Sequence, residues 1–360
     1  MKKIKVLMIG SDNTVKGGIT SVIVQLLKYD WSKKNIEMRF LPTYKSGNSI
    51  KKIMYFCKAY FKFLWLMVTY NPDLLHIHMS HNGSFYRKYI IHKTCKLFGK
   101  KDIIHLHGSE FKVFYDRGNE SRKKRIRNLL KNCNAVFVLG EKWNENIKKI
   151  QPCTKTIVLY NAVALPDVLC NMESKKINIL FLGVLVERKG VKDLLNAILQ
   201  LKKIGILDNY NVKFKIGGTG PEEERLKNFV NENKLTEYVE FLGWVTGDSK
   251  IKLLQNSQIF VLPSYNEGLP IAILEAISYG LPVISTRVGS INEAVIENYN
   301  GHLIEAGDIT NLVNCLSKII TNQEIRSTFG KNSRKLAEEK FDENEYYRLI
   351  SKYYFDIYNV

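Results

Sequence analysis

The sequence predicts an α/β protein with two domains, each built around a parallel β-sheet. The chain has 360 residues, which is long for one hydrophobic core and comfortable for two domains. Hydrophobic residues make up 45% of it, so burial is not limiting and wholesale disorder is excluded. Short apolar runs alternate with helical patterns along the chain, and this alternation is typical of strand–helix–strand units with a parallel sheet.

The predicted elements follow one another in the same manner in both halves. Apolar runs in the first half predict the strands Lys5–Ile9, Asp73–His78, Ile103–His107, Ala135–Leu139 and Thr156–Tyr160. Helical periodicity fills the intervals, at Ile19–Tyr29, Ile50–Thr69, Gly83–Phe98, Arg122–Asn132 and Lys142–Ile150. In the second half we expect the strands Asn178–Leu182, Val212–Ile216, Val239–Leu242, Ile259–Leu262 and Val283–Ser285. Their helices are Val191–Ile204, Glu222–Glu232, Ser249–Gln255 and a segment that begins at Pro270.

The stretch Ala164–Lys176 is weakly patterned and is the expected linker. We therefore expect an N-terminal domain at 1–170, a C-terminal domain at 171–342 and a final tyrosine-rich helix within 343–360. No internal repeat or secretory leader is apparent. The six cysteines show no paired or zinc spacing, so they indicate reduced thiols in a cytoplasmic protein.

The excess of positive charge is confined to the first half of the chain. The net charge is +19, yet residues 1–170 alone hold 31 Lys and Arg against 11 Asp and Glu. An anionic membrane surface attracts such a surplus, and nucleic acid would do likewise, but no nucleic-acid-binding motif occurs. A solubility charge is the plainer alternative, although it would not obviously spare the second half.

The acids Glu267 and Glu275 are the most informative pair. Between them Pro270 suits the first position of a helix, whose positive end would present free amides to an anion such as a diphosphate. These amides belong to Gly268, Leu269 and Ile271. The spacing suits a ligand with a sugar on one side of a diphosphate and a nucleoside on the other. For the isolated pair, a capped helix with a solvated glutamate explains the pattern equally well.

The flanking residues favour the first interpretation. The segment resembles the E-x7-E signature of the retaining family 4 glycosyltransferases, and the resemblance runs through the second half in the family's order. It includes Phe181 to Gly190, Gly217 to Pro221, Phe241 to Val245 and Tyr279 to Thr286. The first half matches more loosely, through Gly17-Gly18, His107-Gly108 and Asn161. The resemblance implies the GT-B architecture, two Rossmann-like domains facing each other across a cleft.

The resemblance also implies roles for single residues. Glu275 would hold the ribose hydroxyls, and Glu267 would bind sugar hydroxyls and orient the anomeric carbon. His107 would contact the sugar from the first domain, where an imidazole can donate a hydrogen bond near neutral pH. The loop Gly17-Gly18 would meet the diphosphate, although such a dipeptide also marks ordinary turns.

No D-x-D metal motif occurs in the chain, so no metal cofactor is expected. The charge of the leaving diphosphate would then be neutralised by cationic side chains and amides. Lys189 is the candidate cation, with Arg188 beside it. The family usually has an arginine where this chain has Val184, and Arg188 is a candidate to replace it.

Two further patterns have open interpretations. His76, His78, His81 and His105 suggest a zinc site, but no cysteine or carboxylate accompanies them at ligand spacing, so a structural role is favoured. The segment Ile50–Thr69 places Lys51, Lys58 and Lys62 on one helical face. It is either an ordinary helix packed on the sheet or an interfacial helix at a membrane surface.

The sequence therefore predicts a metal-independent retaining glycosyltransferase that uses a UDP- or GDP-linked sugar. The expected acceptor is a saccharide, linked to polyprenyl diphosphate at the inner face of the plasma membrane, in bacterial surface polysaccharide synthesis. A nucleotide-sugar epimerase of the same architecture and a catalytically silent partner subunit are the alternatives. The base, the sugar, the acceptor and the linkage are not specified by the sequence.

Overall fold

The computed structural model describes residues 3–359, which form two compact units. The first unit comprises the chain up to Tyr160 together with the segment from Asn344 onward, and the second comprises Asn161–Glu343. The sequence had suggested limits at 170/171 and 342/343. No helix in the described part of the chain is long and apolar enough to cross a membrane.

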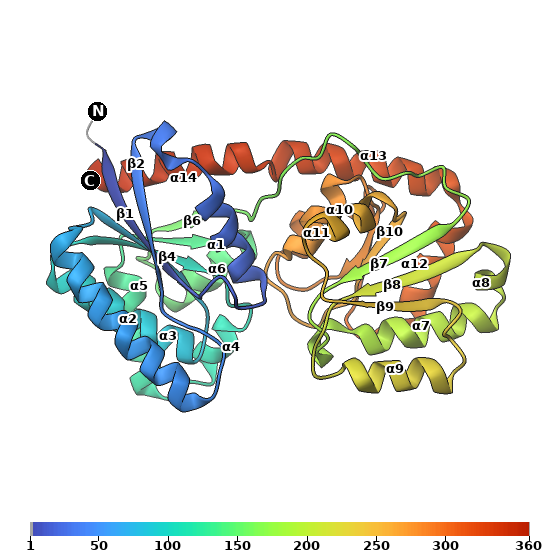
Figure 1. The fold of residues 1–360 in the computed structure, drawn as a ribbon, viewed down its shortest axis with the longest axis horizontal. Coiled ribbons are helices and arrows are strands. Elements are labelled where there is room, and N and C mark those ends of the chain that lie inside the picture. Colours follow the sequence, from blue (N-terminus) through green and yellow to red (C-terminus); the bar gives the residue numbers. More distant parts are fainter. Residues whose placement is uncertain (1–2, 360) are drawn as a thin grey trace. The chain divides into compact units, whose positions relative to one another are not determined.

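A six-stranded parallel sheet forms the first unit, in the order β2-β1-β3-β4-β5-β6. Its strands are β1 (Ile4–Gly10), β2 (Ile36–Pro42), β3 (Leu74–Met79), β4 (Lys101–Leu106), β5 (Ala135–Val138) and β6 (Thr156–Val158). Helices cover both faces, as Figure 1 shows. They are α1 (Gly18–Lys28), α2 (Ser49–Thr69), α3 (Gly83–Leu97), α4 (Phe111–Asp116), α5 (Glu120–Asn132), α6 (Glu141–Ile150) and α14 (Glu343–Asn359), with the short 3-10 helix η1 (Trp31–Lys34) before β2.

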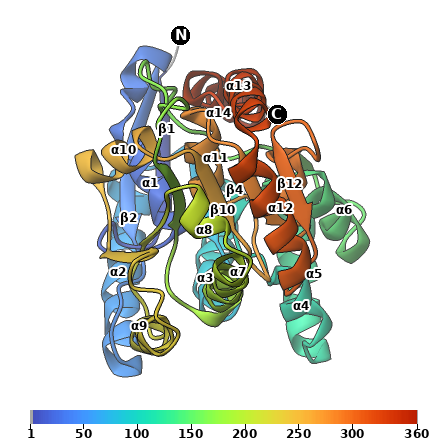
Figure 2. The ribbon, with the colours of Figure 1, turned by 90° about the vertical axis from the view of Figure 1, so that its right-hand side faces the viewer.

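The second unit repeats this plan, with the strand order β12-β11-β10-β7-β8-β9. Its strands are β7 (Ile177–Leu182), β8 (Val212–Gly217), β9 (Val239–Gly243), β10 (Ile259–Leu262), β11 (Val283–Thr286) and β12 (Gly301–Ile304). The helices α7 and α9 cover one face, and α11 and α13 cover the other (Figures 1 and 2). The α-helices of this unit are α7 (Val191–Lys203), α8 (Ile206–Asn209), α9 (Glu223–Glu232), α10 (Gly247–Gln255), α11 (Ile271–Ser278), α12 (Ile309–Thr321) and α13 (Gln323–Lys340), and its 3-10 helices are η2 (Glu187–Lys189) and η3 (Ile291–Glu293).

The predicted α/β class with two parallel sheets is confirmed, while the element list was incomplete. The strands β2 and β12 were not predicted, and neither were the helices α4, α8, α12 and α13. Both missed strands lie at an edge of their sheet, and β2 is only partly buried along its length. An edge strand such as β2 therefore does not need the continuous apolar run by which the central strands were recognised. Strand β12 is buried throughout but has only four residues, two of which are Gly301 and His302.

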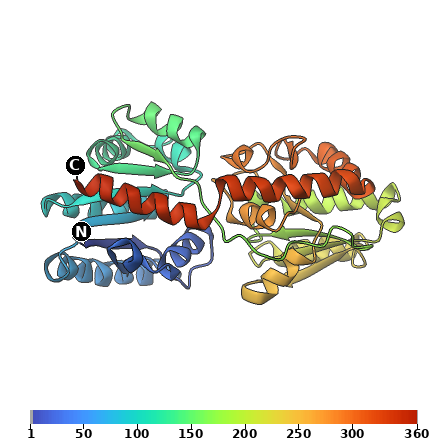
Figure 3. The same ribbon diagram turned by 90° about the horizontal axis from the view of Figure 1, so that it is seen from above.

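Helix α14 belongs to the first unit and lies across its strands (Figure 3). Its tyrosines explain this placement. Tyr347 stacks on Tyr29 with a centroid distance of 4.0 Å, and Tyr354 is fully buried. The hydroxyl of Tyr354 lies 2.5 Å from Nδ1 of His76 on β3. The apolar body of each ring is thus buried, and the polar end of Tyr354 finds a partner inside the unit.

Four histidines line the face of the first sheet toward α14. His76 and His78 alternate on β3, His105 lies beside them on β4, and His107 follows at the end of β4. The Nε2 atom of His76 lies 3.1 Å from Nδ1 of His105, and Nδ1 of His78 lies 2.9 Å from Nε2 of His107. Burial lowers the pKa of His76 to about 3 and the pKa of His78 and His105 well below its ordinary value. These imidazoles are therefore neutral at physiological pH.

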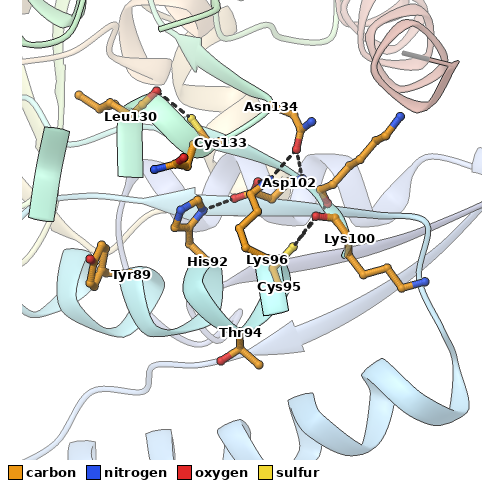
Figure 4. A network of polar contacts seen from close by, with 12 residues as sticks. Tyr89, His92, Thr94, Cys95, Lys96, Lys100, Asp102, Leu130, Cys133 and Asn134 are labelled. Atoms are coloured by element: carbon orange, nitrogen blue, oxygen red, sulfur yellow. Dashed lines mark hydrogen bonds and ion pairs between the residues drawn. The ribbon is translucent and has the colours of Figure 1, made fainter. Parts of the chain in front are cut away.

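A polar network joins α3 to the amino ends of β4 and β5 (Figure 4). Asp102 is fully buried, and its carboxylate lies 2.7 Å from Nδ1 of His92 and 2.5 Å from Nζ of Lys96. Asn134 accepts hydrogen bonds from the backbone of Asp102 and from Lys96. Ligands of parallel α/β sheets bind at the opposite, carboxyl ends, so this network indicates a structural role.

The buried histidines predict a stability that falls as the pH drops below about 6.5. The pKa of His76 is lowered from 6.5 to about 3 by burial in the folded chain, so the unfolded chain binds more protons between these values. Each such histidine should lower the free energy of unfolding by up to about 1.4 kcal/mol per pH unit in this range. Denaturant titrations at about pH 7.5 and about pH 5 measure this slope.

The variant His76→Asn carries no titrating group at this position. Its free energy of unfolding should therefore fall less steeply as the pH drops, by the contribution of one histidine, whatever its absolute stability. A wild-type stability that stays constant over this range would contradict the prediction.

Candidate functional site

The order of the strands directs attention to one edge of the second sheet. The second sheet begins with β7 in chain order. The chain then adds β8 and β9 on one side of β7 and returns to place β10 on the other side. In open parallel sheets, ligands bind outside the carboxyl ends of the strands at such a switch point. The loop after β7 carries Arg188 and Lys189, and the loop after β10 carries Glu267. The structure thus brings these predicted residues to adjacent loops.

Lys189 and Glu267 form a nearly buried ion pair between these loops. The ammonium of Lys189 donates to Oε1 of Glu267, and the two side chains are 13% and 9% exposed. The hydroxyl of Ser264 donates to the same oxygen at 2.8 Å. Thr286, at the end of β11, donates in turn to the carbonyl of Ser264 at 2.5 Å. The carboxylate is therefore held by one cation and one hydroxyl in a site of low solvent access.

The backbone passes very close to this loop at two glycines. A Cβ atom at Gly289 would lie 2.0 Å from the carbonyl oxygen of Glu267, and one at Gly190 would lie 2.0 Å from that of Pro263. Both glycines also have positive φ angles, of 60° and 69°. Only glycine meets both requirements, so the position of the Glu267 loop depends on these two residues.

Arg188 contacts the same loop through its backbone and its side chain. Its Nη1 atom donates to the carbonyl of Asn266 at 3.0 Å, and its own carbonyl accepts from the amide of Tyr265 at 2.8 Å. The side chain is exposed. Arg188 thus braces the loop in this structure, and its replacement of an arginine at the position of Val184 stays a prediction.

Helix α11 begins at Ile271, with Pro270 at the position before it. The sequence had placed Pro270 inside the first turn. The proline has a φ of −67° and a ψ of 123°, an extended conformation from which the chain enters the helix. The amide of Ile271 lies in the first turn of α11, where backbone N–H groups have no partner within the helix. The amides of Gly268 and Leu269 precede it on the loop.

Glu275 lies on α11 and forms an ion pair that the sequence did not reveal. Nζ of Lys250, on α10, lies 2.5 Å from Oε1 of Glu275, and both side chains are partly exposed. Asn161, one of the looser sequence matches, donates to the carbonyl of Leu269 at 2.8 Å. Its Oδ1 atom is buried without a hydrogen-bond partner among the described residues. Asn161 thus fixes the start of α11 from a distant part of the same unit.

In the first unit, Gly17 precedes α1 and Gly18 is its first residue. Gly17 has a φ of 146°, and no atom lies within 4 Å of the point where a Cβ would stand at either glycine. The loop is therefore open on this side, as the approach of a ligand to the backbone requires.

His107 is partly exposed at the carboxyl end of β4, as its sequence position predicted. Its Nε2 atom lies 2.9 Å from Nδ1 of His78, and its ring stacks on His78 with a centroid distance of 5.1 Å. Burial lowers the pKa of His107 to about 3, so its imidazole is neutral near pH 7. With Nε2 engaged by His78, the Nδ1 atom is the one left for another partner.

The structure brings together three of the histidines weighed as zinc ligands. The ligand atoms of His76, His78 and His105 lie within 4.8 Å of one another, and all three residues are fully buried. His76 already bonds to His105 and Tyr354. No cysteine or carboxylate belongs to this group in the described part of the chain. The hydrogen bonds of His76 fit the structural role that the sequence favoured, whereas Nε2 of His78 and Nε2 of His105 are buried without a hydrogen-bond partner among the described residues.

Three contributors to the site were missed in the sequence. Lys250 and Ser264 bind the two glutamates, and His78 binds His107. Ser264 lies three residues before Glu267, a spacing that a loop can bring together. Lys250 is 25 residues before Glu275, and only the fold makes them neighbours.

Comparison with known proteins finds glycosyltransferases among the similar sequences. Residues 171–336 match the family model described as glycosyl transferases group 1. An uncharacterized glycosyltransferase of Methanocaldococcus jannaschii is 27% identical over 337 residues, which cover 91% of this chain and 88% of that protein. The capsular polysaccharide biosynthesis glycosyltransferase CapM of Staphylococcus aureus is 27% identical over 165 residues, or 45% of this chain and 41% of that protein.

Solved structures give the same fold. Sucrose-phosphate synthase from Thermosynechococcus elongatus superposes with a TM-score of 0.81 at 16% identity, covering 99% of each chain. HepE of Anabaena, solved in complex with UDP-glucose, superposes with a TM-score of 0.78 at 15% identity, covering 98% of this chain and all of that one. The predicted GT-B fold is thereby confirmed. The sequence of residues 171–336, a little less than half of the chain, is similar to group 1 glycosyltransferases.

The clearance at Gly289 predicts a large effect of adding one methyl group. Gly289→Ala should unfold more easily than Gly243→Ala, because both have a φ near 60° but only Gly289 faces a backbone carbonyl. The strain of the positive φ is common to both, whereas the clash should cost Gly289→Ala about 1–3 kcal/mol more. Denaturant unfolding of the two variants measures this difference. Equal stabilities would mean that the loop of Glu267 can move away at little cost.

Proposed function

We propose that this chain is a retaining glycosyltransferase of family 4, carrying the E-x7-E signature at Glu267 and Glu275. It would move a sugar from a nucleotide-sugar donor to a saccharide acceptor without a metal ion. The observation that carries the proposal is the Lys189–Glu267 ion pair at the switch point of the second sheet, beside the start of α11. A cation, a carboxylate and a helix N-terminus are there available to one ligand with a diphosphate and a sugar.

The residues of this unit suggest how the donor is held. The diphosphate would lie against the ammonium of Lys189 and the amides that precede and begin α11. Lys189 is already oriented by Glu267, so little side-chain entropy is lost when the phosphate arrives. Arg188 would add a second cation if its side chain leaves the carbonyl of Asn266. Glu275, about one turn after the start of α11, would accept hydrogen bonds from the hydroxyls of the ribose.

The chemical step requires the glycosidic C–O bond to the diphosphate to break as the acceptor oxygen bonds to the anomeric carbon. We propose that the acceptor hydroxyl attacks on the face from which the diphosphate leaves. Its proton passes to the departing phosphate oxygen, so that neither glutamate forms a covalent intermediate. Lys189 and the amides would stabilise the negative charge that grows on the diphosphate. Glu267 and His107 would bind the sugar hydroxyls and position the anomeric carbon.

The similar proteins suggest the substrate class. HepE was solved with UDP-glucose, and the name of CapM assigns it to capsular polysaccharide biosynthesis. By extension we propose a UDP- or GDP-linked sugar as donor and a saccharide linked to polyprenyl diphosphate as acceptor. The product would enter bacterial surface polysaccharide synthesis. The protein would act in the cytoplasm, bound peripherally to the anionic inner face of the plasma membrane, and would take no nucleic acid.

Sugar transfer should survive a chelator, because the chain has no D-x-D motif and offers cations instead. The purified protein is first screened against UDP-, GDP- and ADP-sugars by ligand-detected NMR. Transfer from the donor found in this way is then measured with and without EDTA. Loss of transfer in EDTA and its recovery with Mg²⁺ or Mn²⁺ would contradict metal independence. Conversion of the donor to its epimer without any acceptor would identify an isomerase instead.

Replacing Glu275 should lower nucleotide affinity, whereas replacing Glu267 should lower turnover. Glu275→Gln should weaken the binding of free nucleotide, because its carboxylate is expected at the ribose. Glu267→Gln should leave nucleotide affinity nearly unchanged and lower turnover by about 10²-fold or more, the scale for losing a positioned transition-state contact. Calorimetric titration of nucleotide and steady-state kinetics separate the two effects. Similar losses of nucleotide affinity in both variants would refute this division.

A further inference from the structure

Helix α2 has two apolar faces, and only one of them is used in the core. Its inner face carries Ala59, Phe63, Leu66 and Met67, which are buried against the sheet of the first unit. Residues on the opposite side of the helix are apolar as well but exposed. They are Ile50, Ile53, Met54, Phe61, Trp65 and Val68.

The spacing of the exposed residues makes them one continuous stripe. Their successive intervals of three, one, seven, four and three residues place all six on one side of a helix with 3.6 residues per turn. Phe61 is 72% exposed, Val68 is 70% exposed and Trp65 is 58% exposed. Single exposed apolar residues are ordinary, whereas a contiguous stripe along a helix of 21 residues indicates a surface that meets another apolar phase.

Positive charge borders this stripe. Lys51, Lys58 and Lys62 are exposed and lie along one flank of it, about a quarter turn around the helix. Neither α2 nor the neighbouring α3 contains an acidic residue. The two helices touch where the hydroxyl of Tyr60 meets that of Thr94 at 2.8 Å. One turn beyond Thr94, Leu97 is 85% exposed and adds an apolar side chain on α3.

We propose that the outer face of α2 docks on an anionic phospholipid bilayer. We call this face the α2 stripe, defined by the six exposed apolar residues above and the three flanking lysines. The apolar residues would enter the region between headgroups and acyl chains, with α2 parallel to the surface. The lysine stems would lie along the apolar stripe while their ammonium groups reach the lipid phosphates. Trp65 has the amphipathic ring that prefers this depth.

The rest of the helix supports this use. The inner face fixes α2 in the core, and its first turn is capped by Asn48, whose side chain accepts from the amide of Lys51. The stripe is therefore a preformed surface that need not fold upon binding, so little ordering entropy opposes docking. Figure 1 shows α2 along the outside of the first unit.

This inference deepens the acceptor part of the proposed function, since a lipid-linked saccharide would be met at the same bilayer. It is tested without donor or acceptor, so that lipid binding and sugar transfer succeed or fail separately. The full chain is mixed with vesicles of phosphatidylcholine alone or with phosphatidylglycerol, and the bound fraction is measured by flotation. The protein should bind the anionic vesicles and should bind neutral ones at least about tenfold more weakly. Added salt should weaken binding, because it screens the lysines.

Two sets of variants separate the apolar and the charged contributions. Phe61→Gln, Trp65→Gln and Val68→Gln together should lower vesicle affinity by about tenfold or more. The matched control replaces three exposed apolar residues of the second unit by glutamine, at Val168, Ile204 and Ile251. Neutralising Lys51, Lys58 and Lys62 should lower affinity by about a hundredfold, since each lysine near an anionic surface contributes roughly fivefold. Its control neutralises the exposed lysines Lys175, Lys203 and Lys331.

Both controls should bind like the wild type, and none of the variants should change the binding of a soluble nucleotide sugar. Trp65 gives a direct signal, because its fluorescence should shift to the blue upon docking and the shift should be lost in Trp65→Phe. Equal binding to neutral and anionic vesicles, or none to either, would overturn the proposal. So would sedimentation showing that the stripe variants break a dimer of the wild type without affecting lipid binding, because a second copy would then cover the stripe.

Discussion

The ion pair between Lys189 and Glu267 is the contact on which the candidate site of the second unit depends. It joins the loops that follow β7 and β10, the two neighbouring strands between which the order of the sheet reverses. Burying two charges costs several kcal/mol per ion, and their attraction repays this only when further hydrogen bonds satisfy them. Ser264 supplies such a bond, and Gly190 and Gly289 allow the backbone to approach closely enough for the arrangement to form.

A buried ion pair of this kind usually contributes little net stability to a fold. Apolar residues of similar volume commonly serve as well or better at a buried position. Its presence at the carboxyl edge of a parallel sheet is better explained by ligand binding, since this is where such sheets bind ligands. The pair also keeps each charge oriented before any ligand arrives. In the proposed function, an incoming diphosphate would compete only with one carboxylate for a cation that is already in place.

The sequence predicted the central elements and named candidate site residues, but it did not predict the partners of these residues. Strands such as β3 and β7 are buried along their whole length, so their apolar runs are continuous and easily recognised. The edge strand β2 includes Arg39, which is exposed, and it lacked this signal. Glu267 and Lys189 were found through their motif context, yet they lie 78 residues apart, and nothing local indicates that they form a pair.

Helix α2 illustrates a further limit of periodicity. Its sequence is apolar on two sides, and a pattern of three and four residues cannot tell which side enters the core. The structure decides this through Phe63 and Met67, which are buried, and Phe61 and Trp65, which are exposed. A helix on the surface of a globular protein ordinarily turns its apolar side to the core and its polar side to solvent. The exposed side is therefore the unexpected one, and it needs an explanation outside the fold.

Some lysines of the first half have partners within the fold, whereas the exposed lysines of α2 need another explanation. Lys96 pairs with buried Asp102, and Lys101 donates to the carbonyls of Ile357 and Tyr358 at the end of α14, where a cation also favours the helix dipole. Lys88 is fully buried and donates to Thr43, and burial lowers its pKa to about 7. These three lysines therefore have structural roles inside the first unit. The exposed lysines of α2 lie instead beside an apolar stripe on a helix without acids, a combination whose natural complement is a surface that is both apolar and anionic.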